Sequence, residues 1–155
     1  MEKVTIDDVD GQMSAADVRR PVSKALGTED VAINYYELAP GDSFAFGYHA
    51  HGDQEEVFYV QSGTVTFETD DEDIVVSAGE LIRFAPDEFQ RGVNEGEERV
   101  VALALGAPRD TEDIEMYRHC EECGERTRNK IEMADSRDEL VTSCLDCGAE
   151  TGRFD

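Results

Sequence analysis

A series of short apolar segments divided by turn residues most limits the fold that this chain can adopt. Each segment alternates apolar with polar residues or is continuously apolar, which is typical of β-strands. The segments between residues 31 and 105 are VAINYYEL, SFAFGYH, EEVFYVQ, GTVTFET, DIVVSA, ELIRFA and ERVVALAL. Turn signals such as Pro40-Gly41, Ser62-Gly63 and Ala78-Gly79 separate them. A helical period is missing, so we predict an all-β sandwich or barrel.

Two of the three histidines lie in one of these segments. His49 and His51 are two residues apart, so in a strand both imidazoles point to the same face. After the turn at Gly52-Asp53, the segment EEVFYVQ is expected to return beside the first strand and to place Glu56 opposite the histidines. Two imidazoles and a carboxylate can chelate one divalent ion. The alternative is that the histidines only form hydrogen bonds in the interior.

This spacing resembles the first motif of the cupin superfamily, G-x5-H-x-H-x3–4-E-x6-G. The part from His49 to Gly63 fits without a gap, whereas Ser43 stands in the register of the opening glycine. The resemblance covers about residues 31–105. It implies a small, single antiparallel β-barrel of the cupin type, a jelly roll, with a metal site and a small-molecule pocket inside.

The second cupin motif, G-x5-P-x-G-x2-H-x3-N, is matched only at Gly79 and Asn94. Gln90 replaces the histidine of that motif, so the resemblance implies a site of two histidines and one carboxylate with an optional, weaker fourth ligand. Fe(II), Mn(II), Ni(II) and Zn(II) all suit such donors, and the sequence does not choose among them.

The substrate pocket is expected to include aromatic side chains. Phe58 shares a strand face with Glu56, and Phe44 and Phe46 join them if a bulge at Gly47 reverses their alternation relative to the histidines. The alternative is that these three rings belong to the barrel core.

Four cysteines form two CxxC pairs near the C-terminus, Cys120-x2-Cys123 and Cys144-x2-Cys147. A glycine follows each pair, which allows the backbone to turn so that amides face the thiolates. This segment resembles a zinc ribbon, with RTRNKIEM and DELVTS as a β-hairpin, and its spacing suits one tetrahedral Zn(II). A dithiol redox pair is the alternative, but no βαβ pattern accompanies it.

The domain organisation follows from these segments. Residues 1–30 are expected to cover a barrel edge, with a short helix that Ser14 caps, Pro21 interrupts and Gly27 ends. Residues 31–108 form the cupin barrel, residues 109–117 an acidic linker, and residues 118–155 the zinc ribbon.

The net charge argues against DNA binding and indicates the kind of organism from which the chain comes. The chain has 37 acidic residues against 14 basic ones, a net charge of −23. Such a surface is typical of proteins solvated in molar salt, so we predict a halophile. It offers no basic face to displace counterions, so DNA is not expected as a partner. No segment suits export or membrane insertion, and we expect a cytoplasmic protein.

Two functions remain open at this point, and the sequence names no catalytic acid or base. The first is a metal-dependent enzyme of small-molecule metabolism, either a dioxygenase or an isomerase. The second is a non-catalytic metabolite or metal sensor whose ribbon contacts a partner protein or RNA, since Arg126, Arg128 and Lys130 gather there. A homodimer is a further open partner, and a barrel without metal is the third alternative.

Overall fold

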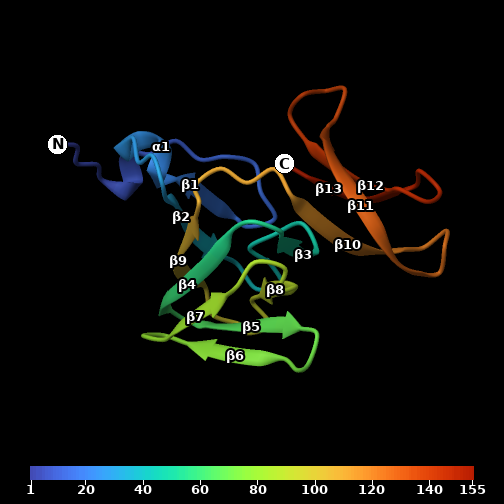
Figure 1. Cartoon of the computed structure of the whole chain (residues 1–155), viewed down its shortest axis with the longest axis horizontal. Coiled ribbons are helices and arrows are strands. Elements are labelled where there is room, and N and C mark those ends of the chain that lie inside the picture. The colour runs from blue at the N-terminus through green and yellow to red at the C-terminus, as the bar shows by residue number, and fades with distance from the viewer.

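The computed structural model describes all 155 residues and consists almost entirely of antiparallel β-sheet (Figure 1). A five-stranded sheet has the order β1 (Val18–Pro21), β2 (Ala32–Leu38), β9 (Val100–Ala107), β4 (Glu55–Ser62) and β7 (Leu81–Phe84). An eight-stranded sheet has the order β13 (Glu150–Phe154), β12 (Leu140–Cys144), β11 (Glu125–Met133), β10 (Ile114–Cys120), β3 (Tyr48–His51), β8 (Gln90–Val93), β5 (Thr64–Thr69) and β6 (Ile74–Ser77). The predicted all-β barrel fold is confirmed.

The core lies between the two sheets because their strands alternate buried and solvated side chains. In β9, for example, Val100, Ala102 and Ala104 are buried while the residues between them are partly exposed. One hydrophobic cluster holds the barrel together and contains Tyr36, Leu38, Phe44, Phe58, Val60, Val65, Phe67, Val76, Phe84, Val100, Ala102 and Ala104. Phe44 and Phe58 pack at its centre with ring centroids 4.9 Å apart.

The N-terminal segment adds a strand to the barrel, and the helix expected from Ser14 is wrong. The Ser14 hydroxyl bonds to the backbone of Ala16, and β1 pairs with β2 instead of forming a helical turn. A short helix, α1 (Val22–Leu26), starts only after Pro21 and ends at Gly27, which has a φ of 69°. A single 3-10 turn, η1 (Ile6–Asp8), precedes these elements. Pairing with β2 outweighs the local helix signal.

Two strand predictions between residues 43 and 93 need correction. The segment SFAFGYH is a strand only from Tyr48 onward, because residues 44–47 bend as they enter the barrel. Strand β8 was not predicted, because its inward positions are occupied by Gln90 and Gly92 and give no apolar alternation.

The predicted acidic linker is also too long, because residues 114–117 belong to β10. This strand pairs with the barrel strand β3 on one side and with β11 on the other. The register with β3 is Ile114↔His51, Glu115↔Ala50, Met116↔His49 and Tyr117↔Tyr48. The C-terminal segment of residues 118–155, called the ribbon below, therefore extends a barrel sheet (Figure 1).

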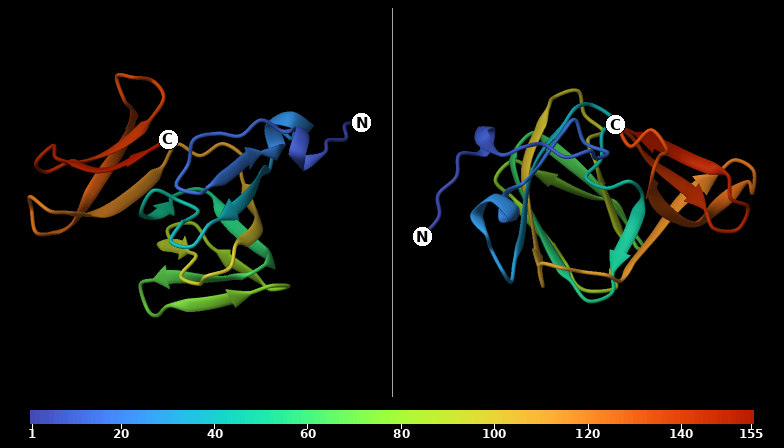
Figure 2. Two further views of the ribbon diagram at one scale, coloured as in Figure 1. Left: turned by 180° about the vertical axis from the view of Figure 1, so that it is seen from behind. Right: turned by 90° about the horizontal axis from the view of Figure 1, so that it is seen from above.

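Seen from above in Figure 2, the barrel strands surround the core, the ribbon lies at one side, and the N-terminal segment lies at the opposite side. No helix in the chain is both long enough and apolar enough to cross a membrane.

Candidate functional site

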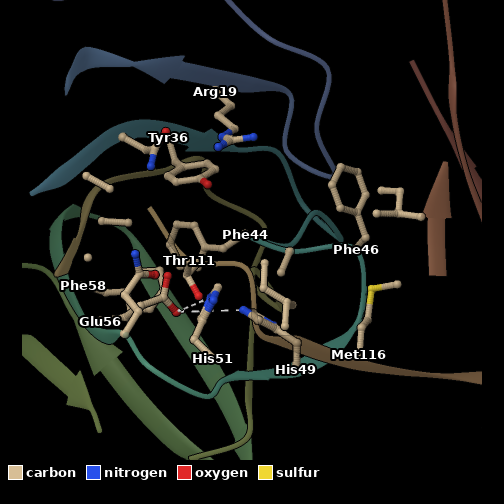
Figure 3. A pocket seen from close by; sticks show the side chains of 18 of the residues that line it. Arg19, Tyr36, Phe44, Phe46, His49, His51, Glu56, Phe58, Thr111 and Met116 are labelled. Atoms are coloured by element: carbon tan, nitrogen blue, oxygen red, sulfur yellow. Dashed lines mark ion pairs between the residues drawn. The ribbon is translucent and has the colours of Figure 1, made fainter. Parts of the chain in front are cut away.

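The candidate metal ligands come from both sheets of the barrel. His49 and His51 lie on β3 of the eight-stranded sheet, whereas Glu56 lies on β4 of the five-stranded sheet. The prediction that β4 returns beside β3 is therefore wrong, since residues 52–54 carry the chain across to the other sheet. Glu56 still meets the histidines because the two sheets face each other across the interior (Figure 3).

The three side chains are close enough to share one ion. The Nε2 atom of His51 lies 3.4 Å from Oε2 of Glu56, and Nε2 of His49 lies 3.9 Å from the same oxygen. Donors that bind one divalent ion at about 2.0–2.2 Å are separated by roughly 3–3.5 Å. The geometry fits a single ion with little adjustment.

The protonation of His49 also suits a metal ligand. Its Nδ1 lies 3.1 Å from the carbonyl oxygen of Gly47 and donates to it, which leaves the Nε2 lone pair directed at Glu56. Burial lowers the pKa of His49, and the charge of Glu56 offsets this effect only in part. The imidazole is therefore neutral near pH 7, as coordination requires.

Glu56 is ionised in the same site. Burial by itself would raise its pKa, but the interactions with His51 and His49 and the hydrogen bond from Gln90 outweigh burial and lower it. A carboxylate held inside the barrel is costly unless a cation or several donors compensate it.

Gln90 occupies the position that the sequence predicted for an optional fourth ligand. It lies directly opposite His49 in the β3–β8 register and is almost fully buried. Its Nε2 donates to Oε2 of Glu56 over 3.0 Å, while its Oε1 is buried without a partner, as is Nδ1 of His51. Rotating the Gln90 amide by 180° would turn its unpaired oxygen toward the other donors. These unpaired atoms are what a site built around a cation would show.

A pocket of about 620 Å³ opens onto these residues and has the size of a site for a small metabolite. Phe44, Phe46 and Phe58 all line it, and Figure 3 shows Phe44 and Phe58 near the candidate ligands. The bend at residues 44–47, rather than a bulge in a continuous strand, brings Phe44 and Phe46 to the pocket. Phe44 and Phe58 also belong to the hydrophobic core, whereas Phe46 does not.

The ribbon forms one wall of this pocket. Arg128, Lys130, Ile131 and Leu145 line it together with barrel residues. Of the three basic residues that suggested a partner for the ribbon, Arg128 and Lys130 project from the outer face of β11 and pair with Glu115 and Glu132. The third, Arg126, lies over the ring of Tyr48 and pairs with Glu68 of the barrel.

The four cysteines form a second cluster at the far end of β10. Their sulfur atoms lie within 4.8 Å of one another, with Cys120 to Cys147 at 3.5 Å and Cys123 to Cys144 at 3.9 Å. Four thiolates bound to zinc at about 2.3 Å lie about 3.8 Å apart, so the spacing fits a tetrahedral ion.

The backbone around the cysteines has the expected knuckles. Gly124 and Gly148 have φ values of 74° and 78°, and their amides donate to the carbonyl oxygens of Cys120 and Cys144. The hydroxyl of Thr127 lies 3.1 Å from the sulfur of Cys144, and this contact and nearby backbone amides lower the pKa of that thiol to about 6.

Several polar residues of the pocket were not found from the sequence, among them Arg19, Tyr36 and Gln54. Arg19 and Tyr36 are cross-strand neighbours on β1 and β2, and Gln54 donates to the carbonyl oxygen of Pro108. The only sequence feature that could have pointed to Arg19 as a pocket residue is that basic residues are scarce in so acidic a chain.

The two facing antiparallel sheets define a barrel of the double-stranded β-helix class, and two histidines and a glutamate of the kind that can hold a metal ion meet inside it. Residues 34–106, just under half of the chain, match the family described as Cupin domain. No curated protein matches the chain significantly.

Solved structures support the same fold. The chain is similar to a cupin-superfamily sugar phosphate isomerase from Silicibacter pomeroyi, with a TM-score of 0.65, 19% identity and coverage of 97% of this chain and 92% of that one. It is also similar to a predicted oxalate decarboxylase from Thermotoga maritima (TM-score 0.59, 19% identity, 69% and 99% covered). A third is the polyketide cyclase RemF from Streptomyces resistomycificus (TM-score 0.62, 21% identity, 78% and 88% covered). At these identities the likeness shows the fold alone.

Proposed function

We propose that the barrel binds one divalent metal ion through His49, His51 and Glu56, with Gln90 as a further donor, and acts on a small molecule in the adjoining pocket. The observation that carries this proposal is the convergence of two imidazole nitrogens and a carboxylate oxygen at 3.4 and 3.9 Å beside an unpaired amide oxygen. The similar structures described as an isomerase, a decarboxylase and a cyclase support small-molecule chemistry.

The chain's own residues prepare this site. The Gly47 carbonyl fixes the tautomer of His49, and the crossing from β3 to β4 holds Glu56 against both imidazoles. Phe44 and Phe58, with ring centroids 4.9 Å apart, form an apolar wall of the same pocket. When bound, the ion would supply Lewis-acid polarisation of a substrate oxygen, with positions left open for substrate. An isomerase or a dioxygenase would both use such a site.

We further propose one Zn(II) in the ribbon, held by Cys120, Cys123, Cys144 and Cys147. Four thiolates complete a tetrahedral shell and leave no open position, so this ion would be structural. The distances between the sulfur atoms support it.

One observation favours the alternative of a metabolite sensor. Asn129, Ile131 and Leu145 of the ribbon line the pocket, so a bound molecule would touch the ribbon directly. Product formation distinguishes an enzyme from a sensor, whereas a sensor would show a ligand-dependent change in the ribbon's hydrogen exchange without turnover.

The test of the metal site is isothermal titration of the full chain with Mn(II), Ni(II) and Fe(II). The full chain is used because β10 pairs with the histidine strand through residues 114–117 and continues without a break into the ribbon. We expect His51→Ala to abolish binding, and Glu56→Gln to weaken it because the ligand charge is lost inside the barrel. Gln90→His should strengthen it because imidazole is the better donor.

His119→Ala is the matched control, since His119 is the third histidine and is exposed on the ribbon side of β10. It should leave the barrel affinity unchanged. Equal, weak binding by the wild type and all three site variants would mean that the histidines are a structural remnant.

A further inference from the structure

The pocket has the opposite charge balance to the rest of the molecule. The whole chain has 37 acidic and 14 basic residues, but Glu56 is the only carboxylate that lines the pocket, whereas two arginines on the barrel side, Arg19 and Arg109, line it. Two further cations at its rim, Arg128 and Lys130, project from the outer face of β11. Solvation in salt explains an acidic surface but does not explain cations gathered around a cavity. A pocket of this kind favours a negatively charged occupant.

Three of these cations already have a carboxylate partner. Arg109 pairs with Asp110 at 2.9 Å, Lys130 with Glu132 at 2.8 Å, and Arg128 lies 3.8 Å from Glu115. Arg19 forms no ion pair, although acidic residues outnumber basic ones so heavily, and its Nε is buried without a hydrogen-bond partner. A half-buried guanidinium without a counter-ion is costly, and a bound anion would remove that cost.

The position of Arg19 suits a ligand that also reaches the metal site. Arg19 lies across from Tyr36 in the β1–β2 register, and Tyr36 packs edge-on against Phe44 with centroids 5.1 Å apart. In Figure 3, Arg19 and Tyr36 lie on one side of the pocket and the candidate metal ligands lie on the other, with Phe44 between them in this view. Burial raises the pKa of Tyr36, and the positive charge of Arg19 opposes part of this rise.

We propose that the substrate or ligand of this pocket is a small anion, whose carboxylate or phosphate group is bound by Arg19 while a polar group at its other end reaches the ion held by His49, His51 and Glu56. The inference rests on the proposed function for the metal end. The guanidinium offers paired N–H donors that match the two oxygens of a carboxylate or phosphate. The phenol of Tyr36 provides a further polar contact beside it.

The test is isothermal titration of the full chain, metal-free and loaded with Mn(II), at constant ionic strength. The probes are succinate, inorganic phosphate and the neutral analogue succinamide. We expect succinate or phosphate to bind at least tenfold more tightly than succinamide. Arg19→Gln should remove about tenfold or more of that preference, the range expected for a charged hydrogen-bonded pair. Arg83→Gln is the matched control, because Arg83 pairs with Glu55 on the exposed outer face and does not line the pocket.

Binding of Mn(II) by each variant separates the two proposals. If the wild type binds no Mn(II), the metal proposal fails, while the anion preference of the metal-free protein still tests Arg19. If Arg19→Gln binds Mn(II) normally and keeps the full anion preference, or if succinamide binds as well as succinate, the role of Arg19 is overturned. If Arg19→Gln loses Mn(II) binding through misfolding, Arg19→Lys tests the role of Arg19 instead. This variant keeps the charge but should bind the anion several-fold more weakly, because the paired N–H donors are gone.

Discussion

Removing zinc should unfold the ribbon while leaving the barrel folded. The ribbon has almost no apolar core: its buried residues are Cys120, Thr127, Asn129, Thr142 and Cys144, and none of them belongs to the hydrophobic cluster of the barrel. Apolar burial therefore contributes little against the conformational entropy of ordering the segment.

The size of the effect follows from this composition. A structural zinc ion contributes about 10–16 kcal/mol of apparent binding free energy in small zinc-dependent units. That equals or exceeds the whole stability of a typical domain, about 5–15 kcal/mol. A ribbon without apolar burial cannot replace such a contribution, so its folded fraction should become small without metal.

Hydrogen exchange measured by mass spectrometry, before and after chelation, checks this expectation. Peptides from β11, β12 and β13 should lose protection, whereas residues 114–117 should keep part of theirs because they also pair with β3. Cys123→Ser should reproduce the chelated pattern, and Asp146→Asn, in the second knuckle but not a ligand, should not. Full protection of β12 and β13 in zinc-free protein would refute the reasoning.

Three other changes test separate parts of the structure. If the acidic surface is an adaptation to salt, dialysis from 1 M to 0.1 M salt lengthens screening from about 3 to about 10 Å and should lower the thermal midpoint; a midpoint equal or higher at low salt contradicts it. Gly92→Ala would place a methyl group 2.6 Å from Phe44 and Phe67 and should cost about 1–3 kcal/mol in chemical denaturation. Its control Gly96→Ala, with the nearest atom at 3.5 Å, should be nearly neutral. Finally, the pKa of His49 is lowered in the folded protein, so as the pH falls the unfolded chain binds a proton at this residue before the folded chain does. The metal-free protein should therefore lose stability as the pH falls below about 6.5. The lowered pKa of Glu56 adds a second loss below about 4.3, which a denaturation series in Glu56→Gln should not show.

Much of the site was predictable because it depends on local geometry. Strand alternation placed His49 and His51 on one face, and the glycine after each CxxC pair predicted the left-handed turns at Gly124 and Gly148. Asn94, in the second cupin motif, holds neighbouring backbone segments together, because its side-chain amide donates to the carbonyl oxygens of Leu38 and Glu98.

The remaining features depend on pairing between distant segments, which a single sequence does not specify. The crossing after Gly52 places Glu56 in a different sheet from His51, although the motif spacing is the same as for a hairpin. Arg19 enters the pocket only because β1 pairs with β2, and its own segment has no strand pattern. The acidic residues before Met116 have the composition of a linker, but the last of them pair with β3, and this pairing is visible only in the structure.

The shared strand β10 has an evolutionary consequence. Met116 lies opposite His49, and Cys120 follows four residues later, so both point to the same face of one sheet, about 13 Å apart by the rise of a strand. Inserting or deleting one residue between them would turn Cys120 to the opposite face and separate it from the other cysteines. Descendants of this protein can therefore change the length of this stretch only two residues at a time, unless a bulge absorbs the odd residue.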